Sequence, residues 1–512
     1  MEFVGERSKD MSRNRKILVT FALVLSNMMA GLDATIINTA LPAIISDLHG
    51  IQYMGWIVAI FLLGMAVSTP LWSKFGEKRG NKVAYITATI VFMIGALFQG
   101  LAPNIIWFIT ARSVMGIGAG GMNTIPFIIY SQIFKNIKRR SQVIGIASAG
   151  FSGTSIIGPL IGGWIVDTFS WHWVFYINLP LALLSIIIIA FFFKIKENLN
   201  HAKVDYHGAI LMVLGLSSIL VGIQLLGVSS IFVTLGFIIV GLLLILWMSR
   251  VENRVDDPIV PNRLFKNEKL VIDLILFALL WGSFVAFNIY IPMWAQGIMG
   301  LSALIGGMTQ IPGAIANFIG SELEPLIQRK ISRYSIIGIG TIAFLISFAG
   351  LYFAKQTASY TFLLIMGVFE GFGVGICFNA LLIAVQFDVE ARDVPISTSF
   401  AYLVRILSQT FMSSIYGVIL NIALMRGVRE SHGSITMGMM NKLSNADAKY
   451  LPQHLIPEMR QIFFQGIHSI MLTAMILIIL VIIILLYLFR REYLALCQIV
   501  LMNSFCIEGN LM

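Results

Sequence analysis

Charged residues are scarce in this chain. Only 12% of its 512 residues are Asp, Glu, Lys or Arg, whereas 58% are apolar and the mean hydropathy is +0.87. Soluble domains contain about 25% charged residues, so this composition excludes an ordinary soluble enzyme and a disordered protein. The three cysteines form no CxxC pair and no cluster with histidine. We therefore expect neither a disulfide scaffold nor a structural zinc site.

Catalytic signatures are also missing. The sequence contains no HExxH, no GxSxG and no Walker GxxxxGK[ST] pattern. Without a nucleotide-binding loop, transport driven by ATP would need another subunit. We therefore predict a protein that is not an enzyme and holds no cofactor and no metal.

Long apolar runs fill most of the chain. A membrane-spanning helix needs about 20 predominantly apolar residues, and charged or turn-rich breaks mark where each run ends. The pattern predicts an all-α membrane protein with fourteen spans. Their expected limits are 17–41, 54–74, 82–101, 105–130, 141–165, 173–193, 208–227, 231–249, 270–295, 302–325, 334–354, 360–382, 397–421 and 466–489.

The basic residues lie mostly on one side of these spans. Of the 35 Lys and Arg, 27 fall in segments on one side, six on the other and two inside apolar runs. Cytoplasmic loops of membrane proteins carry such an excess of Lys and Arg. We therefore expect a protein of the plasma membrane with both termini on the cytoplasmic side. This asymmetry also accounts for the net charge of +10 without a nucleic-acid partner.

A weak internal repeat suggests two similar halves. The fourth span has a glycine-dense run at 111–121 and the twelfth has another at 369–375, and a basic link precedes the third and the eleventh span. Parallel six-helix halves are a known transporter plan. We expect a cytoplasmic segment 1–16, a six-helix bundle 17–193, two inserted helices 208–249, a second bundle 270–489 with a long outer loop at about 421–465, and a cytoplasmic tail 490–512.

Several ionisable residues lie inside predicted spans, where a charge costs at least about 2.5–3.5 kcal/mol. Asp33 is expected to be a protonatable carboxylate that couples proton binding to conformation or attracts a cationic substrate; a static ion pair is the alternative. Arg112 keeps its charge and is expected to hold a carboxylate or a water chain in place. Glu370 and Arg405 are further candidates for proton or substrate binding, although they could instead pair with each other.

Small residues recur at helical spacing. Gly158 and Gly162 lie one turn apart with Pro159 between them, and Gly163 follows. Such spacing lets two helix backbones approach closely, and proline bends a helix because it removes a backbone donor. Close helix packing is the simple interpretation, and the combination of GP and GG in one helix makes the pattern more specific than a single GxxxG.

These patterns resemble the major facilitator superfamily and, within it, the fourteen-helix drug:proton antiporters of bacteria, of the quaternary-ammonium and lincomycin-resistance type. The matching segments are LDATIINTALP at 32–42, LWSKFGEKRGNK at 71–82, RSVMGIGAGG at 112–121, GTSIIGPLIGG at 153–163, WHWVFYINLP at 171–180 and DPIVPNRLF at 257–265. The resemblance covers nearly the whole chain and implies the major facilitator fold, with two inserted helices between the bundles.

The resemblance implies an exporter that exchanges lipophilic, cationic drugs for protons by alternating access. It assigns coupling to Asp33 and Arg112 and the antiporter motif to Gly158, Pro159, Gly162 and Gly163. The residues expected to gate the transporter follow the second span: Glu77, Arg79, Gly80 and Lys82. The partners implied are small drugs or cations, protons and the bilayer, with a monomer as the transporting unit.

This chain departs from the family pattern at some positions. Ser73 replaces the first glycine of the loop motif, Glu77 replaces an aspartate, and His172 stands where arginine is usual. In the family pattern an arginine often precedes the glycines of the twelfth span, and Glu370 stands at this position here. Two other functions remain open: a same-fold exporter of an endogenous metabolite, peptide or lipid precursor, and a membrane receptor or assembly factor that does not transport.

Overall fold

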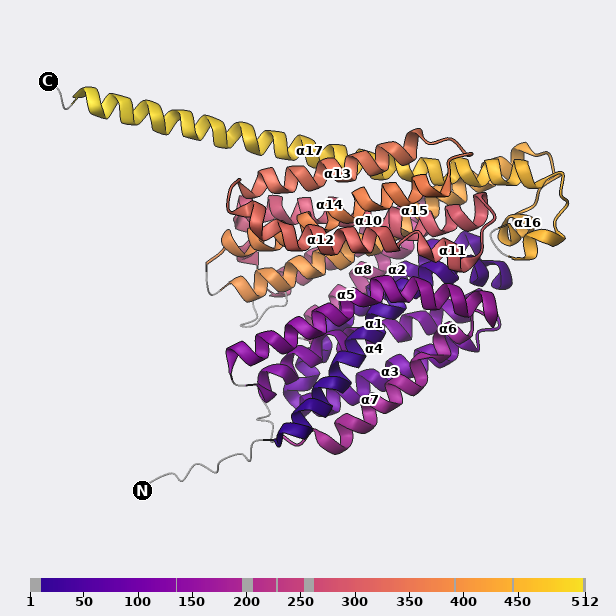
Figure 1. Cartoon of the computed structure of the whole chain (residues 1–512), viewed down its shortest axis with the longest axis horizontal. Helices are drawn as coiled ribbons and strands as arrows, with labels where there is room; N and C mark the ends of the chain where they lie inside the picture. The colour runs from indigo at the N-terminus through magenta and orange to yellow at the C-terminus, as the bar shows by residue number, and fades with distance from the viewer. Residues whose placement is uncertain are drawn as a thin grey trace. The chain divides into compact units, whose positions relative to one another are not determined.

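The computed structural model describes residues 11–134, 136–195, 206–226, 229–252, 262–390, 393–443 and 446–509 (Figure 1). The regular structure in these ranges is helical, and no strand occurs in them. The α-helices are α1 (Arg13–Leu48), α2 (Met54–Arg79), α3 (Asn81–Gly100), α4 (Ile105–Ile133), α5 (Ile137–Thr168), α6 (Trp173–Tyr176), α7 (Asn178–Phe192), α8 (Tyr206–Gln224), α9 (Ile231–Glu252), α10 (Glu268–Met293), α11 (Ala303–Met308), α12 (Ile311–Gln328), α13 (Arg333–Phe353), α14 (Tyr360–Phe387), α15 (Val394–Glu430), α16 (Met437–Lys442) and α17 (Ile456–Gly509).

Eleven helical segments among the described residues are long and apolar enough to cross a membrane. Each expected span falls on one or two helices, and the prediction of an all-α membrane protein is confirmed. Helices α5, α8 and α12 are not among the eleven, so the number fourteen stays a prediction. Short linkers separate the helices, as at Gly80, whose φ of 97° suits glycine and lets the chain turn between α2 and α3.

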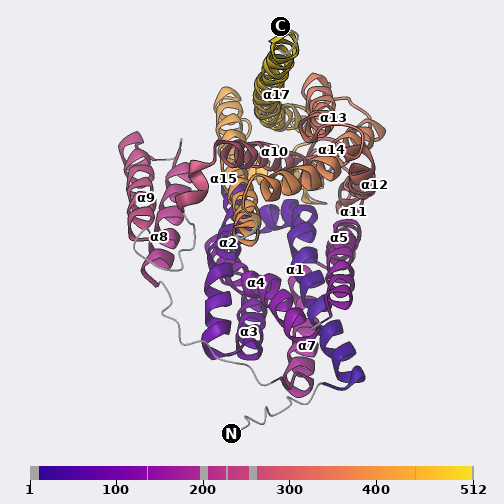
Figure 2. The same ribbon diagram turned by 90° about the vertical axis from the view of Figure 1, so that its left-hand side faces the viewer.

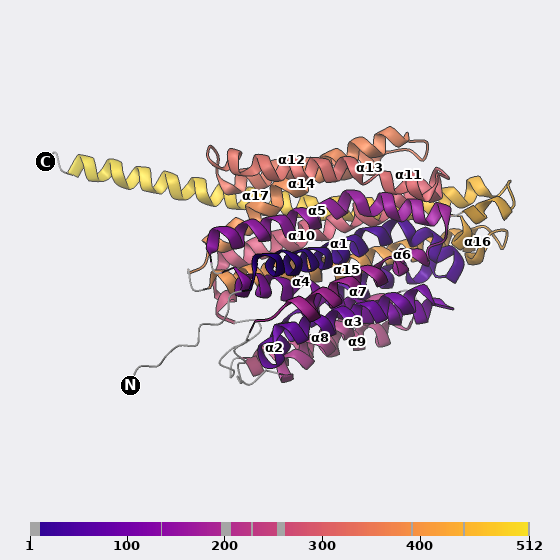
Figure 3. The ribbon, with the colours of Figure 1, turned by 60° about the horizontal axis from the view of Figure 1, so that its bottom comes forward.

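Two compact units can be distinguished, and the first holds most of the chain. It comprises 1–263, 288–311 and 406–470. In it, α4 packs between α2 and α3, and α1 packs along α5 and α7 (Figures 1 and 3). The predicted inserted helices α8 and α9 form a pair, with α8 against α2 (Figure 2). Much of α9 is exposed, as expected for a helix that faces lipid.

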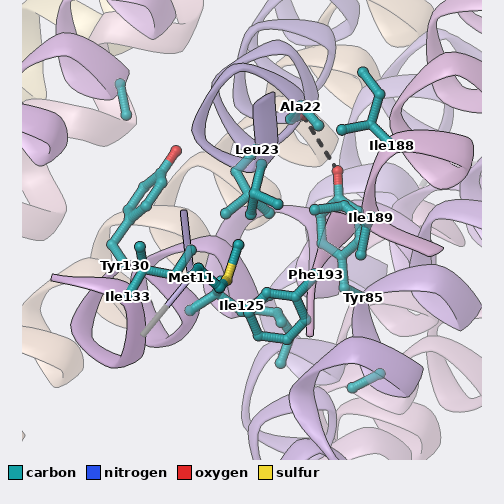
Figure 4. Packing of buried hydrophobic residues seen from close by; sticks show 14 residues of the cluster. Met11, Ala22, Leu23, Tyr85, Ile125, Tyr130, Ile133, Ile188, Ile189 and Phe193 are labelled. Carbon is teal, nitrogen blue, oxygen red and sulfur yellow. Dashed lines mark hydrogen bonds between the residues drawn. The ribbon is translucent and has the colours of Figure 1, made fainter. Parts of the chain in front are cut away.

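An apolar cluster joins α1, α3, α4 and α7 at one end of this unit (Figure 4). Leu23, Ile129 and Ile189 are fully covered in it, and Tyr85 lies among them. Tyrosine can be buried here because its hydroxyl finds polar partners: it lies 2.5 Å from the Ser185 hydroxyl and donates to the Ala22 carbonyl at 3.4 Å. The cluster fixes the positions of the helices that carry the ionisable residues described below.

The second unit comprises 264–287, 312–405 and 471–512. Helix α13 packs along α14, and α12 crosses α14 at glycines. A Cβ on Gly313 would lie 2.9 Å from the carbonyl oxygen of Gly367, and a Cβ on Gly371 would collide with the Gly313 backbone. Only glycine lets two helix backbones approach this closely.

The predicted long loop at 421–465 is shorter than expected. Helix α15 continues to Glu430 and α17 begins at Ile456, so helix occupies both ends of the predicted loop. The segment between them includes α16, and the Asn441 side chain accepts a hydrogen bond from the Ile51 amide at 2.9 Å. Charged residues such as Arg426 and Glu430 led us to end the span early. A helix can extend past the bilayer into water, so charge does not mark its end.

Candidate functional site

Asp33 and Arg112 form a buried ion pair in the first unit. Asp33 lies in α1 and Arg112 in α4, and their side chains are 0% and 1% exposed. An Nη1 hydrogen of Arg112 is donated to Oδ2 of Asp33 at 2.9 Å, while Oδ1 of Asp33 has no hydrogen-bond partner. Removing one partner of such a pair costs about 3–5 kcal/mol, because the other charge remains buried alone.

Arg112 is held by more groups than Asp33. Its Nε donates to the Ile57 carbonyl of α2 at 3.2 Å, and its Nη1 also reaches Oε1 of Gln99 in α3 at 3.4 Å. The guanidinium carbon lies 4.3 Å from the centre of the Phe61 ring. Two helices besides α1, namely α2 and α3, therefore contact this cation, so its position does not depend on Asp33 alone.

Gln99 was missed in the sequence analysis. It is fully buried, and its amide oxygen lies beside the cation while its amide nitrogen reaches back to the Gly95 carbonyl at 3.4 Å. An amide near the end of an otherwise apolar run was the available signal. We passed over it because an uncharged polar residue costs much less in a membrane than an ion.

The glycines of α5 bring this helix against α1. A Cβ on Gly158 would collide with the Thr35 side chain, and one on Gly162 would collide with Ile36. Thr35 adds a polar link, since its hydroxyl donates to the Thr154 carbonyl at 3.1 Å. The small residues therefore fix the spacing between α5 and the helix that carries Asp33.

The same part of α5 also contacts α11. A Cβ on Gly163 would collide with the Leu304 backbone, and one on Gly307 would lie 2.5 Å from the Pro159 carbonyl oxygen. The Asp167 carboxylate accepts hydrogen bonds from the amides of Ala303 at 3.1 Å and Leu304 at 2.9 Å. This carboxylate satisfies amides that the first turn of a helix leaves without partners.

The predicted gating segment lies between α2 and α3. Glu77 is 45% exposed and 3.5 Å from Lys74, one turn earlier. Lys82 donates to the Ala190 carbonyl of α7 at 2.6 Å, and Arg79 is exposed next to Gly80. The segment is thus held against α7 by Lys82, whereas Glu77 pairs within α2. A role of this segment in gating stays a prediction.

His172 precedes the α6 helix and stacks on Trp171, with ring centres 3.8 Å apart. Partial burial lowers the pKa of His172, and the nearby Asp47 carboxylate opposes this shift. Trp171 in turn donates to Asp47 at 2.9 Å. The lowered pKa favours the neutral imidazole at neutral pH.

Glu370 in α14 is 3% exposed, and its Oε1 has no hydrogen-bond partner. The ion pairs found among the described residues do not include one between Glu370 and Arg405, and the alternative that they pair stays a prediction. The two residues lie on different helices, and spacing along the sequence does not reveal how two helices are rotated against each other. Glu324 in α12 is also buried, and neither of its carboxylate oxygens has a partner.

Arg405 in α15 is surrounded by aromatic rings. Its guanidinium carbon lies 5.4 Å from the centre of Phe378 and 5.0 Å from that of Tyr402. Its Nε is buried and has no hydrogen-bond partner. The residue as a whole is partly exposed. A cation–π contact contributes about 0.5–1 kcal/mol at exposed sites and about 2 kcal/mol when desolvated, so the rings only partly offset the cost of placing this cation in a membrane-spanning helix.

A further charged cluster lies where α10 and α13 begin and α14 ends. Arg333 donates to Asp388 at 2.9 Å, and Asn267 donates to the Asp388 carbonyl. Asp273 is fully buried nearby. The sequence analysis used Arg333 only as part of a basic link and did not single out Asp388.

Ions and unpaired carboxylates buried inside apolar helices are typical of proteins that move ions or solutes across membranes. The described residues contain no group of three or more His, Cys, Asp or Glu side chains that could hold a metal. These features define a multi-pass membrane transporter.

The chain belongs to the major facilitator superfamily, whose family model matches residues 23–413. It is a transporter of this superfamily and not an enzyme, as the sequence analysis predicted. Multidrug resistance protein 3 of Bacillus subtilis is 30% identical over 78% of this chain and 79% of its own length. Multidrug transporter protein MdtP of the same organism is 28% identical over 94% of each chain.

Solved structures give the same fold. A bacterial homologue of the human lysosomal transporter Spinster, in an inward-facing and unoccupied conformation, superposes with a TM-score of 0.67. The alignment covers 93% of this chain and 97% of that one at 14% identity. The resemblance to the major facilitator superfamily is thereby confirmed in both sequence and fold.

Proposed function

We propose that this protein exports lipophilic, cationic drugs across a bacterial plasma membrane in exchange for protons. The observation that carries the proposal is the Asp33–Arg112 pair, an ion pair almost fully covered within membrane-spanning helices. The names of the two Bacillus relatives support drugs as the cargo. Both termini lie in the cytoplasm in this proposal, and the transporting unit is a monomer.

The two partners of the pair have different roles. Arg112 stays in place because Ile57, Gln99 and Phe61 also hold it, whereas the contact with Asp33 depends on the charge of the carboxylate. A proton on Asp33 weakens the ion pair and loosens α1 from α4. Proton binding therefore has a different free energy in the two conformations, which coupling requires.

The cycle follows from this difference. Drug enters the inward-open protein and competes with the proton near Asp33; the loaded protein opens outward, releases the drug and takes up a proton from outside. The proton then returns to the cytoplasm and resets the transporter. One charge that crosses 100 mV yields about 2.3 kcal/mol, which drives uphill export.

The test is efflux of ethidium from cells that make the protein. We expect efflux by the wild type, its loss on addition of a proton uncoupler, and its loss in Asp33→Asn. Glu458→Gln, which neutralises an exposed carboxylate in the first turn of α17, is the matched control and retains efflux.

Each result decides a separate point. Efflux that resists the uncoupler contradicts proton coupling. Normal efflux by Asp33→Asn removes Asp33 from the mechanism and leaves the exporter in place. A wild type that moves no drug, although it is inserted in the membrane, rejects the proposed cargo and favours an endogenous metabolite.

A further inference from the structure

Arg405 and four aromatic side chains form a cluster in the second unit, which we name the Arg405 cluster. Phe378 and Tyr402 contact the guanidinium directly. Trp281 and Phe277 of α10 pack on Phe378, with ring centres 5.4 Å and 6.1 Å from it. Helices α10, α14 and α15 thus place one permanent cation beside two partly exposed rings, Phe378 and Tyr402, which the buried rings of α10 support.

The cation lacks a partner of opposite charge. No hydrogen bond or ion pair to the Arg405 guanidinium occurs among the described residues, and its Nε is covered. The ion pairs within the described ranges do not join it to Glu370, the buried carboxylate of α14. Arginine cannot lose its proton to relieve this situation, so the site keeps a net positive charge.

The cluster is nevertheless accessible. Arg405 is partly exposed and Tyr402 is 37% exposed. A guanidinium that faced hydrocarbon would be costly, so its accessible side is expected to face water inside the transporter. The described structure thus combines an accessible cation, unused N–H donors and flat apolar walls.

We propose that the Arg405 cluster binds the anionic group of an amphiphilic cargo, namely a carboxylate or sulfonate attached to a flat aromatic body. The guanidinium donates paired hydrogen bonds to the acid group, a geometry that suits its planar fork. Phe378 and Tyr402 stack on the aromatic body, while the buried Trp281 packs against Phe378. The inference rests on the proposed export function and adds acidic amphiphiles to the cationic cargo.

Two dyes that differ in one group test it. Rhodamine 110 carries a free carboxylate, and rhodamine 123 is its methyl ester. Binding to the purified full-length protein in nanodiscs is followed by fluorescence anisotropy, and transport is followed in proteoliposomes. The ratio of the two affinities is the readout, because a structural defect would weaken both dyes together.

We expect Arg405→Gln to lose about tenfold or more in affinity for rhodamine 110, the size of a lost charge-assisted hydrogen bond. Affinity for rhodamine 123 is expected to stay within about twofold, and Arg405→Lys to retain part of the preference, since lysine keeps the charge without the fork. Arg426→Gln, which removes an exposed arginine from the same helix, is the matched control.

The outcomes separate the two proposals. An affinity ratio that Arg405→Gln leaves unchanged overturns the anion site, even if the protein exports rhodamine 123. Binding of rhodamine 110 that depends on Arg405, without transport of either dye, supports the site and rejects the export function. If Arg405→Gln does not fold, the ratio measured with Arg405→Lys decides: the wild-type ratio contradicts the proposal and a reduced one supports it.

Discussion

Asp33 and Arg112 show how one residue pair can be both stable and responsive. The guanidinium has contacts in α2 and α3 as well as in α1, whereas one oxygen of the carboxylate has no hydrogen-bond partner. A buried carboxylate that has lost its partner can bind a proton and become neutral, but a guanidinium that has lost its partner stays charged. The two single substitutions therefore have different consequences.

In Arg112→Gln, Asp33 is left without its cation. The unpaired, charged carboxylate then destabilises the folded protein by about 3–5 kcal/mol. Lowering the pH removes this destabilisation because a proton neutralises the carboxylate. We expect the melting temperature of Arg112→Gln to approach that of the wild type as the pH falls. The measurement is thermal melting of the purified protein across that range.

The control is Asp33→Asn, which leaves no titratable group in the pair. Its melting temperature is expected to stay below that of the wild type by a constant amount over the same pH range. The double variant is expected to lose less melting temperature than the sum of the two single losses. If the loss of melting temperature in Arg112→Gln does not change with pH, the unpaired carboxylate is not the cause of the destabilisation.

At the scale of elements, α5 is the helix whose small residues matter most. Its glycines contact α1 at Gly158 and Gly162 and α11 at Gly163, while a Cβ on Gly153 would meet nothing within 4 Å. A single helix thus contains crowded and open glycines of identical chemistry. Their comparison separates steric effects from the general effect of removing a glycine.

Gly163→Ala places a methyl group against the Leu304 backbone, which cannot rotate away as a side chain could. Overpacking of this kind costs about 1–3 kcal/mol, so we expect the contact between α5 and α11 to loosen and efflux to fall severalfold. Gly153→Ala is expected to match the wild type. Efflux rate and melting temperature are the measurements, and equal behaviour of both variants would contradict the close contact.

At the scale of the whole molecule, the chain divides into two compact units whose bounds differ from those of the two predicted bundles. Residues 288–311 and 406–470 of the predicted second bundle group with the first. Contacts such as Asp167 with α11 and Asn441 with Ile51 account for this grouping. The expected bundles 17–193 and 270–489 stay a prediction from the internal repeat.

The orientation in the membrane can be tested with reporter fusions. We expect alkaline phosphatase, which is active only outside the cytoplasm, to be active when fused at Gln453. A fluorescent protein that matures only inside is expected to fluoresce when fused at Lys330 or at the C-terminus. The reason is the one-sided distribution of Lys and Arg. An inactive phosphatase at Gln453 would reverse the predicted orientation.

The sequence by itself determined the class of protein, the helices and the candidates for the site. Apolar runs and buried charges are local properties, so Asp33, Arg112, Glu370 and Arg405 stand out without coordinates. Only the tertiary structure decided which of them meet. It paired Asp33 with Arg112, 79 positions away, and placed the Gln99 amide oxygen beside the same guanidinium. It also placed Arg405 beside the rings of Phe378 and Tyr402. These neighbours could not be predicted, because the rotation and register of packed helices depend on many side-chain contacts at once.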